Sequence, residues 1–183
     1  GAELISFDVG SSSVGKGESL VDTLRTLRAL GADLVVLRHE RSGAPWLAAR
    51  TFDGSVINAG DGWHAHPTQA LLDLSVLSAH LGGGDGSLRG RSIAIVGDLL
   101  HSRVARSNLH TLIAAGASVR LAGPANLVGG FAELADALTR AAHERSGEAS
   151  GSARLVSSID AALERSEEHT SELQSRLHLV CRL

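Results

Sequence analysis

The sequence is poor in the residues that mark several classes of protein. Its 183 residues contain one cysteine, Cys181, and no methionine or tyrosine. A lone cysteine excludes an internal disulfide framework and a cysteine-rich zinc site. The net charge of -3 excludes the basic surface typical of nucleic-acid binding, and no apolar run reaches the ~18 residues that a membrane span needs. We therefore expect a protein of the reducing cytoplasm that binds neither nucleic acid nor membrane.

Aromatic residues make up only 3% of the chain, whereas hydrophobic residues make up 43%, so the core must be aliphatic. Apolar runs of strand length alternate with segments of helical period. This alternation predicts an α/β fold of two parallel-sheet units, with helices on both faces and a long helix joining the units. The expected strands are Leu4–Phe7, Leu34–Leu37, Val56–Ile57, Ser92–Val96, Ser118–Leu121 and Arg154–Val156. The expected helices are Ser19–Leu30, Ala44–Arg50, Pro67–Leu81, Ser102–Ala115, Phe131–His143 and Ser158–Glu164.

Composition shifts divide the chain into three parts. The glycine-rich stretch 82–86 is the best linker, so residues 1–81 form one unit with the joining helix and residues 82–164 form the second. Small polar residues predict a surface loop over His143–Ser152. Residues 165–183 begin with RSEEHTSELQS, which resembles a translated sequencing adapter and predicts a non-native tail that adds nothing to the fold. The missing methionine and the strand-like start predict a segment of a longer protein.

Two polar segments follow expected strands near the start of the chain. Ser11–Glu18 brings hydroxyls, glycines and Lys16 together, so Ser12, Lys16 and backbone N–H groups can wrap a phosphate or carboxylate. The alternative is a solvated turn. Arg38 comes directly after the strand LVVL, where open parallel sheets bind ligands. Its guanidinium can hold an anion with two hydrogen bonds, and the alternative is a surface ion pair.

The richest polar segment is Asn58–Gln69, between a strand and a helix. Pro67 fixes the helix start and places His66 at its mouth, where the helix dipole favours a neutral imidazole that donates one hydrogen bond. Such a ring beside a carbonyl is an electrophilic catalyst, and Gln69 lies one turn on. A helix-capping histidine remains an alternative. A metal bound by His64 and His66 is a weaker one, because no third ligand is evident.

The turn Val96–Asn108 opens the second unit. It lacks the GxGxxG fingerprint, so it does not favour a nicotinamide dinucleotide. Arg103, in the first turn of the following helix, is suited to a carboxylate, and a surface arginine is the alternative.

Four segments together resemble the aspartate carbamoyltransferases: SSSVGKGESLVDT, VLRHERSGAP, VINAGDGWHAHPTQALLDL and IAIVGDLLHSRVARSN. The resemblance extends over nearly all of Gly1–Glu164, and HPTQ with NAGDG is its most specific part. The related ornithine enzymes usually carry HPCQ instead. The resemblance implies transfer of the carbamoyl group from carbamoyl phosphate to L-aspartate, with no metal or other cofactor.

The resemblance also implies roles for individual residues. Arg38 and His66 would contact carbamoyl phosphate, with His66 polarising its carbonyl, and Gln69 would hold the carbamoyl NH2. Arg103 would bind an aspartate carboxylate. Ser12 and Lys16 would reach into a neighbouring subunit's site, which makes a homotrimer necessary, with regulatory chains as further partners.

The sequence also departs from the family pattern. The family's Ser-Thr-Arg-Thr phosphate segment, its arginine-glutamine pair for aspartate and its later proline-leucine turn are not in these residues. We therefore expect negligible turnover from this polypeptide by itself. A carbamoyltransferase acting on another amino acid such as ornithine, and a non-catalytic homologue that scaffolds a complex, remain alternatives.

Overall fold

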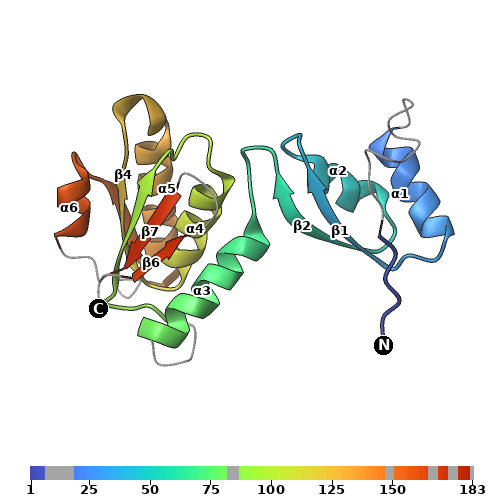
Figure 1. Ribbon diagram of the computed structural model, residues 1–183, viewed down its shortest axis with the longest axis horizontal. Helices are drawn as coiled ribbons and strands as arrows, with labels where there is room; N and C mark the ends of the chain where they lie inside the picture. The colour runs from blue at the N-terminus through green and yellow to red at the C-terminus, as the bar shows by residue number, and fades with distance from the viewer. Residues whose placement is uncertain (7–18, 82–86, 147–150, 165–168, 173–176, 182–183) are drawn as a thin grey trace.

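The computed structural model shows two α/β units side by side, connected by one helix that runs between them (Figure 1). It describes residues 1–6, 19–81, 87–146, 151–164, 169–172 and 177–181. The linker expected at 82–86 and the loop expected over Ser11–Glu18 lie outside the described residues. No described helix is long and apolar enough to cross a membrane.

The first unit contains α1 (Leu20–Ala29), β1 (Leu34–His39), α2 (Ala44–Thr51) and β2 (Ser55–Asp61). The two strands pair in parallel, which requires a crossover connection, here α2. Hydrophobic side chains of both helices and both strands form an apolar cluster on one face of this sheet. On the other face, the exposed side chains include three large hydrophobic ones: Leu34, Val36 and Ile57.

The joining helix α3 spans Pro67–Leu81, which are the bounds that the sequence predicts. It leaves β2 at the first unit and lies against the second, where Leu81 is buried in the main core with Leu74 and Leu77 packed beside it. One helix thus belongs to both units, so residues at its start are positioned by both.

The second unit is built around a sheet with the strand order β5-β4-β3-β7-β6. Helices α4 and α5 pack on one face and α6 on the other, so helices on both faces are confirmed for this sheet. Its elements up to residue 164 are β3 (Ser92–Gly97), α4 (Arg103–Ala114), β4 (Ser118–Ala122), the 3₁₀ turn η2 (Ala125–Leu127), α5 (Phe131–Ser146), β5 (Ser152–Leu155) and α6 (Ile159–Leu163).

The last two strands differ from the sequence expectation for residues beyond Glu164. Strand β7 (Leu177–Cys181) pairs antiparallel with β3, and β6 (His169–Glu172) pairs antiparallel with β7. Without β7, the edge of β3 away from β4 would present unpaired N–H and C=O groups. An extended segment such as β7 can form hydrogen bonds with them. The division of the chain at residues 81 and 164 stays a prediction.

Two expected elements are wrong. Residues 4–6 are not a strand, and Leu4 is exposed, because a strand needs a hydrogen-bonded neighbour and β1 has only β2 beside it among the described residues. The loop expected from His143 is wrong for residues 143–146, since α5 continues to Ser146. Its last turn carries His143 and Arg145, basic residues that suit a helix C-terminus.

The core of the second unit yields a stability prediction. Leu109 on α4 is fully buried in the main cluster, so Leu109→Ala leaves a cavity and is expected to lower the free energy of unfolding by about 2–5 kcal/mol. The exposed Leu72 on α3 provides the matched control, and Leu72→Ala is expected to change it by less than about 0.5 kcal/mol. Urea unfolding followed by circular dichroism measures both, and equal losses would contradict this core assignment.

Candidate active site

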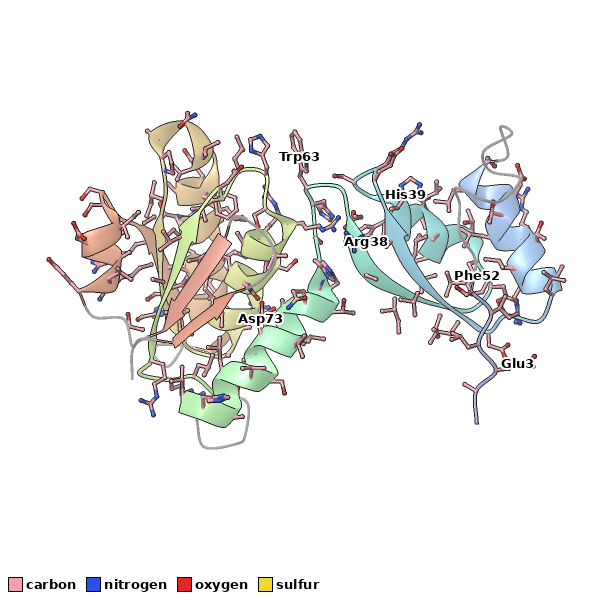
Figure 2. The ribbon with its side chains drawn as sticks, viewed as in Figure 1. Glu3, Arg38, His39, Phe52, Trp63 and Asp73 are labelled. Carbon is pink, nitrogen blue, oxygen red and sulfur yellow. The ribbon has the colours of Figure 1, made fainter. Side chains whose placement is uncertain are left out.

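The carboxyl ends of β1 and β2 form the first part of the site. Parallel pairing sets His39 beside Asp61, and the Gly62 N–H donates to the His39 carbonyl at 3.0 Å. Arg38 therefore lies next to the loop that carries His66. Figure 2 shows Arg38 reaching from the first unit into the space before α3. This is the position at which open parallel sheets bind ligands.

Asp61 is a fully buried carboxylate that holds this loop together. It accepts hydrogen bonds from the Gly43 N–H at 2.6 Å, the Asn58 Nδ2 at 2.8 Å and the His64 Nδ1 at 3.1 Å. Burial alone would raise the pKa of Asp61, but these hydrogen bonds outweigh it and hold the pKa below its ordinary value. The carboxylate thereby ties the start of α2 to the segment leading to His66.

His66 lies at the mouth of α3, as predicted. Its backbone N–H donates to the Ser107 Oγ of α4 at 2.8 Å. Its ring Nδ1 faces the Gln69 N–H at 3.4 Å and the Thr68 Oγ1 at 3.3 Å. An Nδ1 that accepts from a backbone N–H carries no proton, so the neutral ring holds its proton on Nε2. That N–H is the hydrogen-bond donor which an electrophilic role requires.

Arg103 approaches the same loop from the second unit. It is the first residue of α4, after the N-cap Ser102, and its Nη1 donates to the Gly62 carbonyl at 3.3 Å. A side chain at Gly60 would meet the Arg103 Cζ at 3.0 Å and the His66 Cδ2 at 3.2 Å. The arginine and the histidine therefore come together over a glycine, and only a residue without a Cβ leaves room for both.

Positive charge at the site lowers the proton affinity of His66 and of Arg103. Burial lowers the pKa of His66 below its model-peptide value of 6.5, and the positive charges of Arg103 and Arg38 lower it further, while Asp73 partly opposes them. The pKa of Arg103 is lowered by burial and by Arg38, although an arginine stays protonated in proteins. The site thus pairs a neutral imidazole with two cations, an arrangement suited to an anionic ligand that has a polarisable carbonyl.

The structure brings four predicted residues into one region: Arg38, His66, Gln69 and Arg103. The other two, Ser12 and Lys16, lie outside the described residues, so their roles stay predictions. Within the described part of the chain, no group of three or more His, Cys, Asp or Glu side chains could hold a metal ion. His64, weighed as a metal ligand, directs its Nδ1 to Asp61.

Sequence reasoning missed the residues that support the site: Asn58, Gly60, Asp61, Asp73, Ser107 and Asn108. Asp73 was detectable, because it follows Gln69 by four residues on a helix and such pairs face each other. The Gln69 Nε2 donates to its Oδ1 at 3.0 Å. Ser107 and Asn108 carried no such signal, since only the packing of α4 on α3 brings them near.

Trp63 marks the outer end of the loop between the units (Figure 2). Its ring is mostly exposed and meets the His101 ring edge-on, with ring centroids 4.6 Å apart. His101 in turn directs its Nδ1 to the Asp98 carboxylate at 2.9 Å. This contact spans the turn before α3 and the turn before α4.

Comparison with known proteins agrees with this geometry. Residues 1–79 match the family model described as "Aspartate/ornithine carbamoyltransferase, carbamoyl-P binding domain". The chain is 59% identical over 128 residues to the aspartate carbamoyltransferase catalytic subunit of Chloroflexus aggregans. This match covers 70% of this chain and 40% of that subunit. The chain is 55% identical over 130 residues to that of Gluconacetobacter diazotrophicus, covering 71% and 39%.

Solved structures agree as well. The aspartate transcarbamoylase of Trypanosoma cruzi in complex with carbamoyl aspartate and phosphate superposes with a TM-score of 0.74 at 31% identity, over 89% of this chain and 50% of that one. The same enzyme with N-(phosphonacetyl)-L-aspartate gives a TM-score of 0.68 at 32% identity, over 82% and 46%.

The matched residues 1–79 therefore resemble the carbamoyl-phosphate-binding domain of the aspartate/ornithine carbamoyltransferases. Within that family, the chain is homologous to the aspartate carbamoyltransferase catalytic subunits. It spans about 40% of the length of the curated relatives that it matches.

The electrostatics of His66 generate a testable prediction. Its imidazole is expected to titrate below 6.5, so it is neutral at pH 7. Arg103→Met removes a nearby positive charge and is expected to raise this pKa. Arg106→Met, on the same helix but with its guanidinium over the Phe131 ring, is expected to leave it unchanged.

An NMR titration of the histidine ring carbons measures the three pKa values, and the resonance lost in His66→Asn assigns the signal. A His66 pKa above 6.5 in the parent chain would contradict the description of the site as a cationic cluster around a neutral ring.

Proposed function

We propose that the residues described here serve carbamoyl transfer from carbamoyl phosphate to L-aspartate, which yields N-carbamoyl-L-aspartate and phosphate. The observation that carries the proposal is the meeting of His66 and Arg103 over Gly60, with Arg38 near enough for its charge to lower the pKa of both. Two fixed positive charges suit a substrate with phosphate and carboxylate groups, and the neutral imidazole suits its carbonyl. The homology to aspartate carbamoyltransferase catalytic subunits supports the choice of substrates.

The reaction forms one C–N bond and breaks one C–O bond. The amine of aspartate attacks the carbamoyl carbon, and its carbonyl oxygen gains negative charge in the tetrahedral intermediate. The His66 Nε2–H donates to that oxygen, and Arg38 balances charge on the same substrate. When the intermediate collapses, the C–O bond to phosphate breaks, phosphate leaves with the electron pair, and the nitrogen loses a proton.

Arg103 is assigned to the second substrate. It begins α4 in the second unit, and its Nη1 is anchored by the Gly62 carbonyl, so its other N–H donors are proposed to bind a carboxylate. The hydrogen bond from the His66 Nε2–H, by contrast, strengthens as charge develops on the carbonyl oxygen. It therefore lowers the activation barrier rather than only improving substrate binding.

The assembly completes the proposal. Ser12 and Lys16 would act in the site of a neighbouring subunit within a homotrimer, with regulatory chains as possible further partners in a cytoplasmic enzyme. The chemistry described above is served by hydrogen-bond donors and charges from the chain, and we propose no cofactor.

Catalysis by His66 is tested in a chimera in which residues 1–114, through the end of α4, replace the matching segment of the Chloroflexus aggregans catalytic subunit. We expect the chimera to form carbamoyl aspartate and His66→Ala to lower kcat by about 10²–10⁴-fold, because the oxyanion loses its donor. His64→Ala is the matched control, since His64 points to Asp61 instead. Unchanged turnover in the His66 variant would favour the non-catalytic scaffold.

Substrate choice is tested with two bisubstrate analogues on the same chimera. N-(phosphonacetyl)-L-aspartate, which carries two carboxylates, is expected to inhibit strongly. Its L-ornithine counterpart is acylated on the side-chain nitrogen and carries one carboxylate and an ammonium, so it is expected to inhibit weakly. Inhibition constants from steady-state rates give the ratio. Arg103→Met is expected to reduce that ratio, and a preference for the ornithine analogue in the parent chimera would replace aspartate with another amino acid.

A further inference from the structure

Asp73 is a buried carboxylate on α3, one helical turn beyond Gln69. Figure 2 shows it on the side of α3 that faces the second unit. Its Oδ1 accepts from the Gln69 Nε2 at 3.0 Å, and its Oδ2 accepts from the Asn108 Nδ2 at 2.8 Å. Each carboxylate oxygen is thus engaged by an amide group from a different helix.

This contact fixes the orientation of the Gln69 amide. A glutamine amide presents donors at Nε2 and an acceptor at Oε1, and an ionised carboxylate only accepts. Turning the amide over would aim the Gln69 carbonyl at the Asp73 carboxylate and lose the hydrogen bond. The Nε2 is therefore held on Asp73, and among the described residues no hydrogen bond reaches the Oε1. The end of the amide left for a ligand is its acceptor.

An acceptor at this position discriminates between acyl groups of the same shape. A carbamoyl group carries an NH2 that donates a hydrogen bond, whereas an acetyl group carries a methyl that does not. Gln69 follows His66 by one helical turn, and its backbone N–H faces the His66 ring Nδ1 at 3.4 Å, so the residue that carries the side-chain amide adjoins the proposed electrophile. An amide held the other way round would present an NH2 to the ligand's NH2 and oppose it.

Asn108 supplies the second support of Asp73. It is fully buried on α4, and its Oδ1 has no hydrogen-bond partner among the described residues. The neighbouring Ser107 accepts from the His66 backbone N–H. Consecutive residues of α4 therefore hold both the histidine backbone and the carboxylate that orients Gln69, so the second unit helps to set the polarity of a site in the first.

We propose that Asp73 is a positioning residue that holds the Gln69 amide with its carbonyl toward the ligand, and so selects a carbamoyl group over an acetyl group. The identity of the selected group rests on the proposed function. The orientation of the amide rests on the two hydrogen bonds to Asp73 alone.

Asp73→Asn is a variant of nearly the same shape that lacks the negative charge. In Asp73→Asn, the new Oδ1 can still accept from Gln69, and the new Nδ2 can donate to the Asn108 Oδ1 once that amide turns over. This variant removes the charge and keeps the amide orientation. Asp73→Ala removes both, and Asp73→Ser does the same with a smaller cavity in case the alanine variant does not fold. Asp136→Ala removes an exposed carboxylate from α5 and is the matched control.

The test is an NMR titration of the ¹⁵N-labelled chain with two phosphonates that differ only in NH2 against CH3. These are phosphonoacetamide and 2-oxopropylphosphonate. We expect the parent, Asp73→Asn and Asp136→Ala to prefer phosphonoacetamide. In Asp73→Ala or Asp73→Ser, we expect this preference to fall by about three- to tenfold, as for the loss of one hydrogen bond.

Two readouts separate positioning from a general structural effect. The Gln69 side-chain amide protons should exchange slowly with solvent in the parent and in Asp73→Asn, and faster in Asp73→Ala and Asp73→Ser. The pKa of His66 should fall in all three Asp73 variants, because each removes a negative charge that raises it. The charge effect is therefore shared by variants that differ in amide orientation.

An unchanged preference together with unchanged Gln69 exchange in Asp73→Ala or Asp73→Ser would overturn the proposal. Loss of preference in Asp136→Ala would also overturn it, because that carboxylate is remote from the site. If the parent binds neither phosphonate, the selection of a carbamoyl group by this chain fails, whereas turnover of the chimera still decides the proposed function. Exchange of the Gln69 amide would then still decide whether Asp73 orients it.

Discussion

The site depends on the close approach of α4 to the loop before α3, and that approach depends on the missing side chain at Gly60. Arg103 and His66 occupy the volume that a Cβ would take. The backbone φ of +116° at this position also favours glycine. Because the two units meet here, the same glycine sets the distance between the group that would polarise one substrate and the group that would bind the other.

Two arginines beside a neutral imidazole are an arrangement under electrostatic tension. Arg38 and Arg103 both lower the pKa of His66, and Arg38 also lowers the pKa of Arg103. This repulsion between positive charges is unfavourable until an anion arrives. Asp61 is close enough to offset part of it for Arg103. Its own charge is committed to three hydrogen-bond donors, so it stabilises the loop without neutralising the ligand-facing cations. The rigidity of the loop and the affinity for anions therefore arise from different groups.

Much of the fold could be predicted from periodicity, because each amphipathic segment carries its own signal. The helix Pro67–Leu81 was predicted at both ends, since Pro67 starts it and the glycine run follows Leu81. Leu4 was misassigned because a strand is decided by its neighbour, which local sequence does not reveal. The antiparallel pairing of β7 with β3 was not predicted for the same reason. The pairing of an edge strand depends on which segment of the chain reaches it, and local sequence does not reveal that.

The candidate site divides in the same way. Arg38, His66, Gln69 and Arg103 were predictable because each sits at the end of a strand or the start of a helix, positions that chemistry favours for ligands. Asp61 gave no separate signal within NAGDG, since nothing local says that its carboxylate is buried against Gly43 rather than exposed to a ligand. Ser107 and Asn108 were invisible, because their role comes from helix packing between units that are distant in sequence.

The edge-on contact of Trp63 with His101 has a spectroscopic consequence. The chain contains no tyrosine, so Trp46 and Trp63 account for its near-ultraviolet absorption almost entirely. The Trp63 ring meets the His101 ring across the boundary between the units, while Trp46 lies on α2 within the first. With Trp46 replaced by phenylalanine, the remaining fluorescence would come from Trp63. Its emission would then report the distance between the turn before α3 and the turn before α4, and so any relative movement of the two units.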